Sequence, residues 1–195
     1  MKPHPILFAA LLLPLSACIS FGEEPPSTLL TLTPDSSFAA GQTRTAGDGR
    51  AVAVIPPSVP QSLNVLRVPV QTGATSIAYL KKAQWVEPPS RLFRNLLAET
   101  IAAKTGRPTL DMRQYSQAPG LRLGGRLQQF GLDATQGQVV VQYDASLARG
   151  GTAPLETRRF EARVPVASED AQSVAAALNR AANQVAGEVA DWIGA

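Results

Sequence analysis

The chain contains a single cysteine, Cys18, and this count limits how the protein can be stabilised. One cysteine cannot form a disulfide within the chain, and no second thiol is available to complete a metal site. The only histidine, His4, lies near the same N-terminus. A fold built from this sequence must therefore depend on buried apolar side chains, and 195 residues are enough for one domain with such a core.

The residues before Cys18 have the pattern of a bacterial lipoprotein signal peptide. Lys2 supplies a positive charge, and Ile6 to Leu13 form an apolar run that is too short to span a bilayer, which takes about 20 residues. Leu15 to Cys18 read LSAC, which matches the lipobox, where a dedicated peptidase cleaves before a lipid-modified cysteine. An ordinary secretory site fits less well, because it wants a small residue in place of the leucine. We predict a signal peptide over residues 1–17 and lipidation, palmitate included, at Cys18.

The residues after the cysteine predict where the domain is held. Lipoproteins of Gram-negative envelopes commonly stay in the inner membrane when Asp follows the cysteine, so Ile19 favours the outer membrane. Two or more acyl chains anchor a protein stably. Residues 18–27 include Gly22 and a Pro-Pro pair, which predict an irregular tether that spans at most roughly 30 Å. We expect the remaining domain, 28–195, to stay at the periplasmic face of the envelope.

Cleavage before the cysteine would leave few groups for catalysis. The whole chain has 18 basic and 15 acidic residues, and cleavage would remove Lys2. The mature chain is therefore only weakly basic, and we do not expect nucleic acid as a partner. Cleavage would also remove His4, and lipidation would consume the thiol. Ser-His-Asp and Cys-His catalysis and His- or Cys-ligated zinc are thereby excluded. We expect no metal and no cofactor, while chemistry by carboxylate, lysine, tyrosine or serine remains open.

Two short motifs have structural explanations. Lys104-Thr105-Gly106 spells the KTG of penicillin-recognising enzymes, but the S-x-x-K and S-D-N partners are missing from the chain. We interpret it as a helix end closed by Gly106. Gly120 to Gly125 fits neither a phosphate-binding loop nor a dinucleotide fingerprint, and it lies in a strand pattern, which favours a bulge or close backbone packing.

The period of the apolar residues predicts short strands, one helix, longer strands and a second helix. A loop is expected at 35–50, and Pro69 indicates an edge strand or a bulge. Ser90 and Ser168 are expected to cap the two helices. The strands are predicted at 28–34, 51–57, 65–71, 75–85, 121–132, 139–147 and 158–166, and the helices at 91–105 and 169–192. This order predicts one layered α/β (α+β) domain.

Several segments, taken in order, resemble the ABC-type transport auxiliary lipoproteins. They are the lipobox, TLLTLTP at 28–34, VAVIPPSVP at 52–60, the segment from Tyr79 to Pro88, and the stretch from RRFEA at 158 to the C-terminal helix. The likeness covers residues 18–195, and the order of the motifs carries it more than any single one. That family includes the lipoprotein of paraquat-inducible operons and lipoproteins encoded beside mammalian-cell-entry (MCE) type substrate-binding proteins.

The resemblance implies a fold and a role. The fold is a single three-layer α/β domain with a mixed, partly antiparallel β-sheet and two main helices, similar to the N-terminal domain of the Tol-system propeller protein. The role is that of a non-enzymatic accessory component that works with an MCE-domain protein and its ABC permease and ATPase to move lipids or other hydrophobic molecules. A homo-oligomer is possible. Residues 35–50, Val68 to Val70 and Pro89 depart from the usual family pattern.

The segment between a strand and the first helix is the best candidate for partner binding. Tyr79, Trp85 and Glu87 lie there, and exposed aromatic residues are frequent anchors at interfaces. A purely structural explanation is that Trp85 packs in the core and Glu87 favours the helix N-terminus. Trp192 continues an apolar helix stripe and is expected in the core. Arg159, Glu161 and Arg163 are expected to form a solvated strand face.

Three functions remain open from the sequence. The first is the membrane-anchored adaptor, and the second is a lipid carrier, which would need an unfilled apolar pocket. The third is an envelope hydrolase with an acidic pair. Asp111, Asp133 and Asp144 form no recognisable constellation in the sequence, which makes the hydrolase the weakest of the three.

Overall fold

The computed structural model describes residues 27–43, 45, 49–111 and 119–194. Within these residues, seven strands form one sheet and two long α-helices accompany it. The strands are β1 (Val52–Val54), β2 (Arg67–Gly73), β3 (Ser76–Gln84), β4 (Thr109–Leu110), β5 (Leu121–Asp133), β6 (Gln138–Arg149) and β7 (Glu156–Pro165). The helices are the 3-10 helix η1 (Gln61–Leu63), α1 (Pro89–Thr105) and α2 (Ala171–Gly194).

Strand β5 organises the sheet because both of its edges are used. Along one edge it pairs with β6 in antiparallel register over its whole length, and β6 in turn pairs with β7. Three segments share the other edge of β5. Strand β1 pairs in parallel with its start, Ser58 forms an isolated bridge to Arg126, and β2 pairs in parallel with its end. Strand β3 extends the sheet beyond β2, and β4 extends it beyond β1. The predicted single α/β (α+β) domain with a mixed, partly antiparallel sheet and two main helices is confirmed.

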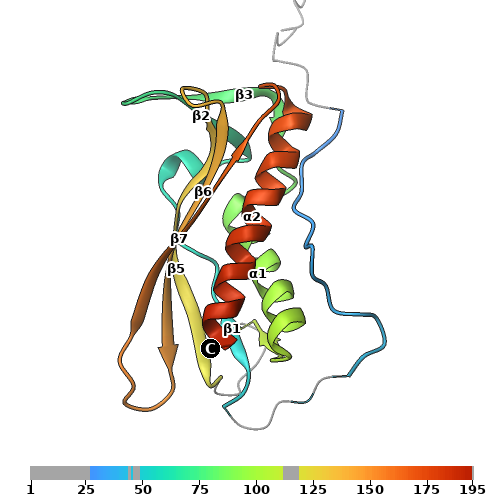
Figure 1. Ribbon diagram of the computed structural model, residues 1–195, viewed down its shortest axis with the longest axis vertical. Coiled ribbons are helices and arrows are strands. Elements are labelled where there is room, and N and C mark those ends of the chain that lie inside the picture. Colours follow the sequence, from blue (N-terminus) through green and yellow to red (C-terminus); the bar gives the residue numbers. More distant parts are fainter. Residues whose placement is uncertain (1–26, 44, 46–48, 112–118, 195) are drawn as a thin grey trace, which may run out of the picture.

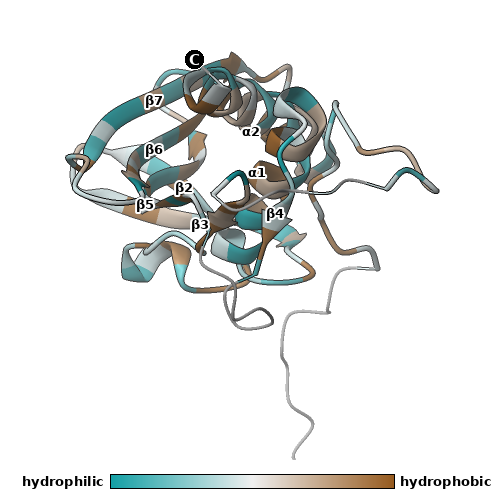
Figure 2. Ribbon diagram, turned by 90° about the horizontal axis from the view of Figure 1, so that it is seen from below, coloured by the Kyte–Doolittle hydropathy of each residue, from teal (hydrophilic) through white to brown (hydrophobic). Residues whose placement is uncertain are grey.

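The sheet curves, and both α-helices lie on its concave side (Figure 2). The segment 55–66 with η1 crosses the opposite, convex side and adds a thinner layer there (Figure 1). Strand β4 was not predicted from the sequence, because two residues are too few to show a period of apolar side chains. The remaining predicted strands, from 51–57 onwards, are present with shifted ends.

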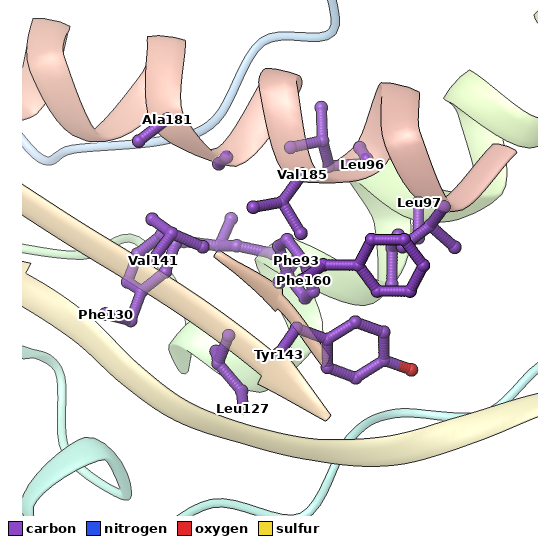
Figure 3. Close-up of a cluster of buried hydrophobic side chains, with 14 of the residues drawn as sticks. Phe93, Leu96, Leu97, Leu127, Phe130, Val141, Tyr143, Phe160, Ala181 and Val185 are labelled. Atoms are coloured by element: carbon purple, nitrogen blue, oxygen red, sulfur yellow. The ribbon is translucent and has the colours of Figure 1, made fainter. Parts of the chain in front are cut away.

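The core fills the space between the helices and the sheet (Figure 3). Phe93 on α1 lies at its centre, with its ring 6.3 Å from that of Phe130 and 5.3 Å from that of Tyr143 in an edge-to-face arrangement. The face of α2 that meets the sheet carries fully buried Ala181 and Val185, and such small side chains let the helix approach closely. Burial alternates along β6, where the core-facing residues from Val139 to Leu147 are all buried.

Both helices begin at residues other than the predicted caps. Helix α1 starts at Pro89 with Pro88 as its N-cap residue, because proline is preorganised for the first helical position. At the start of α2, the Asp170 carboxylate accepts hydrogen bonds from the backbone N–H groups of Gln172 and Ser173, both at 2.9 Å. The expectations for Ser90 and Ser168 as caps were therefore wrong. The end of α1 at Gly106, which has φ +72°, is as predicted.

The first predicted strand, 28–34, is not formed. Residues 28–38 instead make an extended segment, the N-terminal strap, that runs along the helices (Figure 1). Only Leu30 forms a β-bridge, to Trp85. Further along, the side-chain amide of Asn183 on α2 accepts from the Asp35 N–H at 2.8 Å and donates to the Thr33 carbonyl at 2.9 Å. Side chains thus satisfy the strap backbone, which explains why a strand-like sequence joins no ladder.

The irregular positions in the sheet have steric causes. Pro69 lies in β2, which is flanked by β3 and β5, so its alternative as a bulge is confirmed and its alternative as an edge residue is wrong. Gly131 on β5 faces Pro69, and a Cβ at residue 131 would lie 2.4 Å from the Pro69 carbonyl oxygen. Gly125 has φ +139°, and a Cβ there would lie 2.1 Å from the Asp144 carbonyl oxygen. Gly125 and Gly131 thus serve close backbone packing, which is one of the two explanations considered from the sequence for the segment 120–125.

Candidate functional site

The three residues predicted to bind a partner do not share one surface. Tyr79 and Pro69 are paired across β3 and β2, and Tyr79 points to the convex side of the sheet. Its hydroxyl lies 3.4 Å from the Ser62 carbonyl oxygen, and the Arg67 guanidinium stacks over its ring at 4.0 Å. The Tyr79 side chain is half-buried, so part of its ring remains accessible.

Trp85 points the other way, into the core. Its exposed fraction is 0%, and its ring lies 5.5 Å from that of Phe130. Its backbone N–H donates to the Leu66 carbonyl at 2.7 Å. In this structure Trp85 holds the segment in place and presents no surface of its own, as in the structural explanation considered from the sequence.

Glu87 lies just before α1 and is half-buried. The amide of Asn95 on that helix donates to its carboxylate at 3.5 Å. Between Trp85 and Glu87, Val86 projects outward with an exposed fraction of 51%. The accessible part of the predicted partner-binding set is therefore Tyr79 on one side and Glu87 at the helix start on the other.

Sequence reasoning missed two features of the same region. The first is the pair Lys81 and Lys82 on β3, which are both exposed although neighbours on a strand normally point to opposite faces. The second is a groove of about 330 Å³ on the convex side, between η1 and strands β2, β5 and β6. Its apolar lining includes Leu63, Ile77 and Val140. The adjacent lysines were a readable signal, whereas the groove depends on long-range packing.

The charged face predicted on β7 is solvated, as expected. Arg159 is paired with Asp144 on β6, with 2.6 Å between Nε and Oδ1, and Arg163 is paired with Glu161 at 2.7 Å. The hydrogen bond from Arg159, followed by that from Gln128, lowers the pKa of Asp144 from its ordinary value of 3.8 to about 2. A carboxylate held ionised in this way is a poor general acid at neutral pH.

The other buried or acidic groups also have structural roles. Burial raises the pKa of Tyr143, whose hydroxyl donates to the Gly124 carbonyl at 2.6 Å. Asp133 accepts hydrogen bonds from Thr135 in the hairpin turn, and Asp111 lies 4.0 Å from Arg94. Trp192 is half-buried against the core. Among the residues that the structure describes, no group of three His, Cys, Asp or Glu residues could hold a metal ion.

Cys18 lies outside the described residues, so the predicted lipidation is not tested by the structure. Over the described ranges, no helix is long and apolar enough to cross a membrane. Lys104, predicted to lie at the C-terminal end of α1, is there and pairs with Asp191 of α2 at 2.8 Å. The KTG motif is thus part of the helix-pair packing.

Comparison with known proteins identifies the relatives of this domain. A family described as "ABC-type transport auxiliary lipoprotein component" matches residues 30–190. A crystal structure of a Xanthomonas campestris protein assigned to the family DUF330 is 18% identical, with a TM-score of 0.67, 85% of this chain and 94% of that chain covered. A crystal structure of an uncharacterised protein is 20% identical, with a TM-score of 0.64, 77% of this chain and 96% of that one covered. At these identities the two structures show a shared fold alone. The curated proteins contain no significant match.

Proposed function

The chain belongs to the family of ABC-type transport auxiliary lipoprotein components, and on that premise we propose that it acts as a membrane-anchored, non-enzymatic adaptor. The observation that carries the proposal is the family match over residues 30–190, which span nearly all of the described domain. The chemistry of the site supports an adaptor, because the acidic residues considered for hydrolysis are each engaged by neighbouring side chains. Binding, and not turnover, is the activity that the accessible residues fit.

The finer role that we propose is assistance to an MCE-type system that moves lipids or other hydrophobic molecules across the envelope. The partners would be the MCE-domain substrate-binding protein and its permease and ATPase, with a homo-oligomer of this chain as a further possibility. The adaptor would need no cofactor, no metal and no nucleic acid.

The anchor that we propose is a lipid-modified Cys18 after removal of residues 1–17, with the tether 18–27 holding domain 28–195 at the periplasmic face of the outer membrane. Mass spectrometry of the N-terminal peptide tests this directly. We expect acyl chains on Cys18, and the variant Cys18→Ala is expected to accumulate as an uncleaved precursor. Normal cleavage of that variant would contradict the anchor.

We propose that partners dock at two separate places, at Tyr79 on the convex side of the sheet and at Glu87 at the start of α1, with Trp85 supporting both from the core. Tyr79 offers an aromatic face braced by Arg67, and Glu87 offers a carboxylate at the start of α1. Tyrosine is one of the residues that most often anchor protein interfaces, and a carboxylate at the rim contributes charge complementarity with a basic partner. Trp85 contributes through the position of the chain between them.

The test is purification of the full chain from its native envelope in mild detergent, followed by identification of the proteins that accompany it. We expect an MCE-domain protein in the wild-type sample and a loss of about tenfold or more in the double variant Tyr79→Ala/Glu87→Ala, since two anchors of ~1 kcal/mol each are removed. The control is Arg122→Ala/Arg158→Ala, which alters exposed residues elsewhere in the sheet. Recovery of no transport component from the wild type would overturn the adaptor.

A lipid carrier is the second candidate, and the groove on the convex side is the observation that favours it. The groove combines Leu63, Ile77 and Val140 with polar Gln71 and Arg163, a mixture that suits a lipid with a polar head. Phospholipid that co-purifies with wild type and is lost from Val140→Asp would support the carrier. Equal lipid content in the two proteins would contradict it.

A further inference from the structure

Strand β3 contains a pronounced bulge next to the point where the N-terminal strap meets the sheet. Arg67 of β2 pairs with Gln84 of β3, and the next pair is Pro69 with Tyr79. Between these two pairs β2 moves by two residues whereas β3 moves by five, so the extra residues form a bulge in β3. Bulges are designed features that often re-aim side chains, and this one places Lys81 and Lys82 in solvent together.

Lys82 has φ +54°, and within the described residues it is the only non-glycine residue with a positive φ. A left-handed lysine is strained by about 1–3 kcal/mol, and such strain persists only where the surrounding structure imposes it. Glycine would remove the strain without removing the bulge. The sequence nevertheless places a charged residue at this position, beside a second lysine.

The bulge lies at the end of the molecule where the described part of the chain begins. Leu30 forms its bridge with Trp85, directly after β3, and the described chain begins a few residues earlier at that same end (Figure 1). Two large apolar side chains are exposed beside the bridge, Leu29 at 52% and Val86 at 51%. Exposed lysines next to exposed apolar side chains are the combination found on protein surfaces that contact lipid headgroups.

The length of the tether sets how near this surface lies to the membrane. If Cys18 carries the anchor, eight residues lie between it and Ser27, and the nine Cα-to-Cα steps allow at most roughly 30 Å. Acidic Glu87 lies beyond the end of β3, where its carboxylate accepts from Asn95 on α1. Within the bulge itself, between Tyr79 and Gln84, the charged residues are the two lysines, so the charge that the bulge presents is positive.

We propose that this end of the domain, formed by Lys81, Lys82, Leu29 and Val86, contacts the surface of the anchoring membrane and binds its anionic phospholipid headgroups. The bulge supplies the two ammonium groups, and the apolar pair enters the headgroup layer. Contact would fix the orientation of the domain on its short tether, with the long axis of the helices directed away from the bilayer. This inference rests on the lipid anchor of the proposed function.

The experiment uses the full lipidated chain reconstituted into vesicles of phosphatidylcholine alone and of phosphatidylcholine with 30% phosphatidylglycerol. Amide hydrogen exchange is followed in residues 76–86, with β7 as the internal reference. A lysine near an anionic surface strengthens binding by about fivefold, so two lysines are expected to slow exchange at the bulge by about 30-fold on the anionic vesicles. Exchange in β7 is expected to be equal on both vesicles.

Two variants separate lipid contact from folding. Lys82→Gly removes one charge but suits the left-handed backbone, so it should fold at least as well as wild type and lose about fivefold of the protection. Lys81→Glu/Lys82→Glu should lose all of it, whereas the control Arg122→Glu/Arg158→Glu carries the same change of charge at other exposed sites and should lose none.

The outcomes are distinguishable. Attachment of wild type to both vesicles without protection at 76–86 on the anionic ones would overturn this inference and leave the anchor intact. Equal protection on neutral and anionic vesicles, or full protection in the double glutamate variant, would overturn it as well. Failure to attach to either vesicle would overturn the anchor and this inference together.

Discussion

The two halves of the sheet are built differently. From β5 to α2 the chain forms long hairpins and a long helix, with β5 and β6 paired almost without interruption from Leu121 to Asp133. From the strap to β3 it proceeds by single bridges, prolines and bulges, and it meets β5 only at short stretches. The regular half supplies most of the core, while the irregular half carries the accessible groups that we assign to partners and membrane.

This difference indicates that the regular half provides most of the stability and that the irregular half provides the surfaces for recognition. Long ladders satisfy the backbone locally and leave side chains free to pack, so the regular half is expected to unfold as one unit. The irregular half depends on particular side chains that bind particular backbone atoms. Single substitutions there are expected to open a segment without unfolding the domain.

The strongest test of this division is Phe93→Ala in the shared core. Phe93 is fully buried and contacts the rings of Phe130 and Tyr143, so its truncation leaves a cavity and is expected to lower the free energy of unfolding by ~3–5 kcal/mol. Urea denaturation measures the loss. Leu155→Ala is the control, because Leu155 is 63% exposed and its truncation should change little. A loss below about 1 kcal/mol for Phe93→Ala would contradict the central role of this packing.

A smaller and more local effect is expected for Asn183→Ala. The substitution removes the side-chain amide that holds the backbone of Thr33 and Asp35, and each lost bond of this kind contributes about 1 kcal/mol. Hydrogen exchange over 30–36 should accelerate by tenfold or more, with exchange in β5 and β6 unchanged. Gln184→Ala, at the next position on α2 and exposed, is the matched control. Equal acceleration throughout the domain would show that the strap and the core form one cooperative unit.

The smallest effect is expected from the ion pair on the regular half. The pKa of Asp144 is lower in the folded state, at about 2, than its ordinary 3.8, so the unfolded chain binds more protons between these values. The pair therefore stabilises above about pH 4 and its contribution is lost as the pH falls towards 2. Because Arg159 is 61% exposed, we expect less than about 1 kcal/mol. The pH dependence of the urea midpoint, compared with that of Asp144→Asn, measures it; an unchanged profile in the variant would refute the assignment.

The regular half could be predicted from the sequence more accurately than the irregular half. The alternation in β6 and the apolar stripe of α2 are local patterns, and the structure follows them closely. The strap was predicted as a strand because TLLTLTP has strand composition, but its partners are two asparagines about 150 residues away. No local pattern could reveal that.

The candidate site was harder to predict for a related reason. Trp85 and Tyr79 belong to one strand pattern, but the bulge between them changes which face each residue takes. Proline at the start of α1 and Asp170 before α2 replaced the predicted serine caps, since several capping residues stood side by side in the sequence. Where several neighbouring residues could each begin a helix, the tertiary contacts determine which one does.

The strap also determines how the domain would respond to mechanical force. For a domain held by its N-terminus, a pull on the tether reaches Leu30 first, where backbone bonds join it to Gln84 and Val86, and then the asparagine amides of α2. These bonds lie in succession along the strap, so the load would pass to the helix one attachment at a time. At the sheet, only the end of β3 at Gln84 would be loaded at the start, and the remaining strands would be loaded after the strap had peeled away. The domain would therefore lengthen under tension before its core was disturbed.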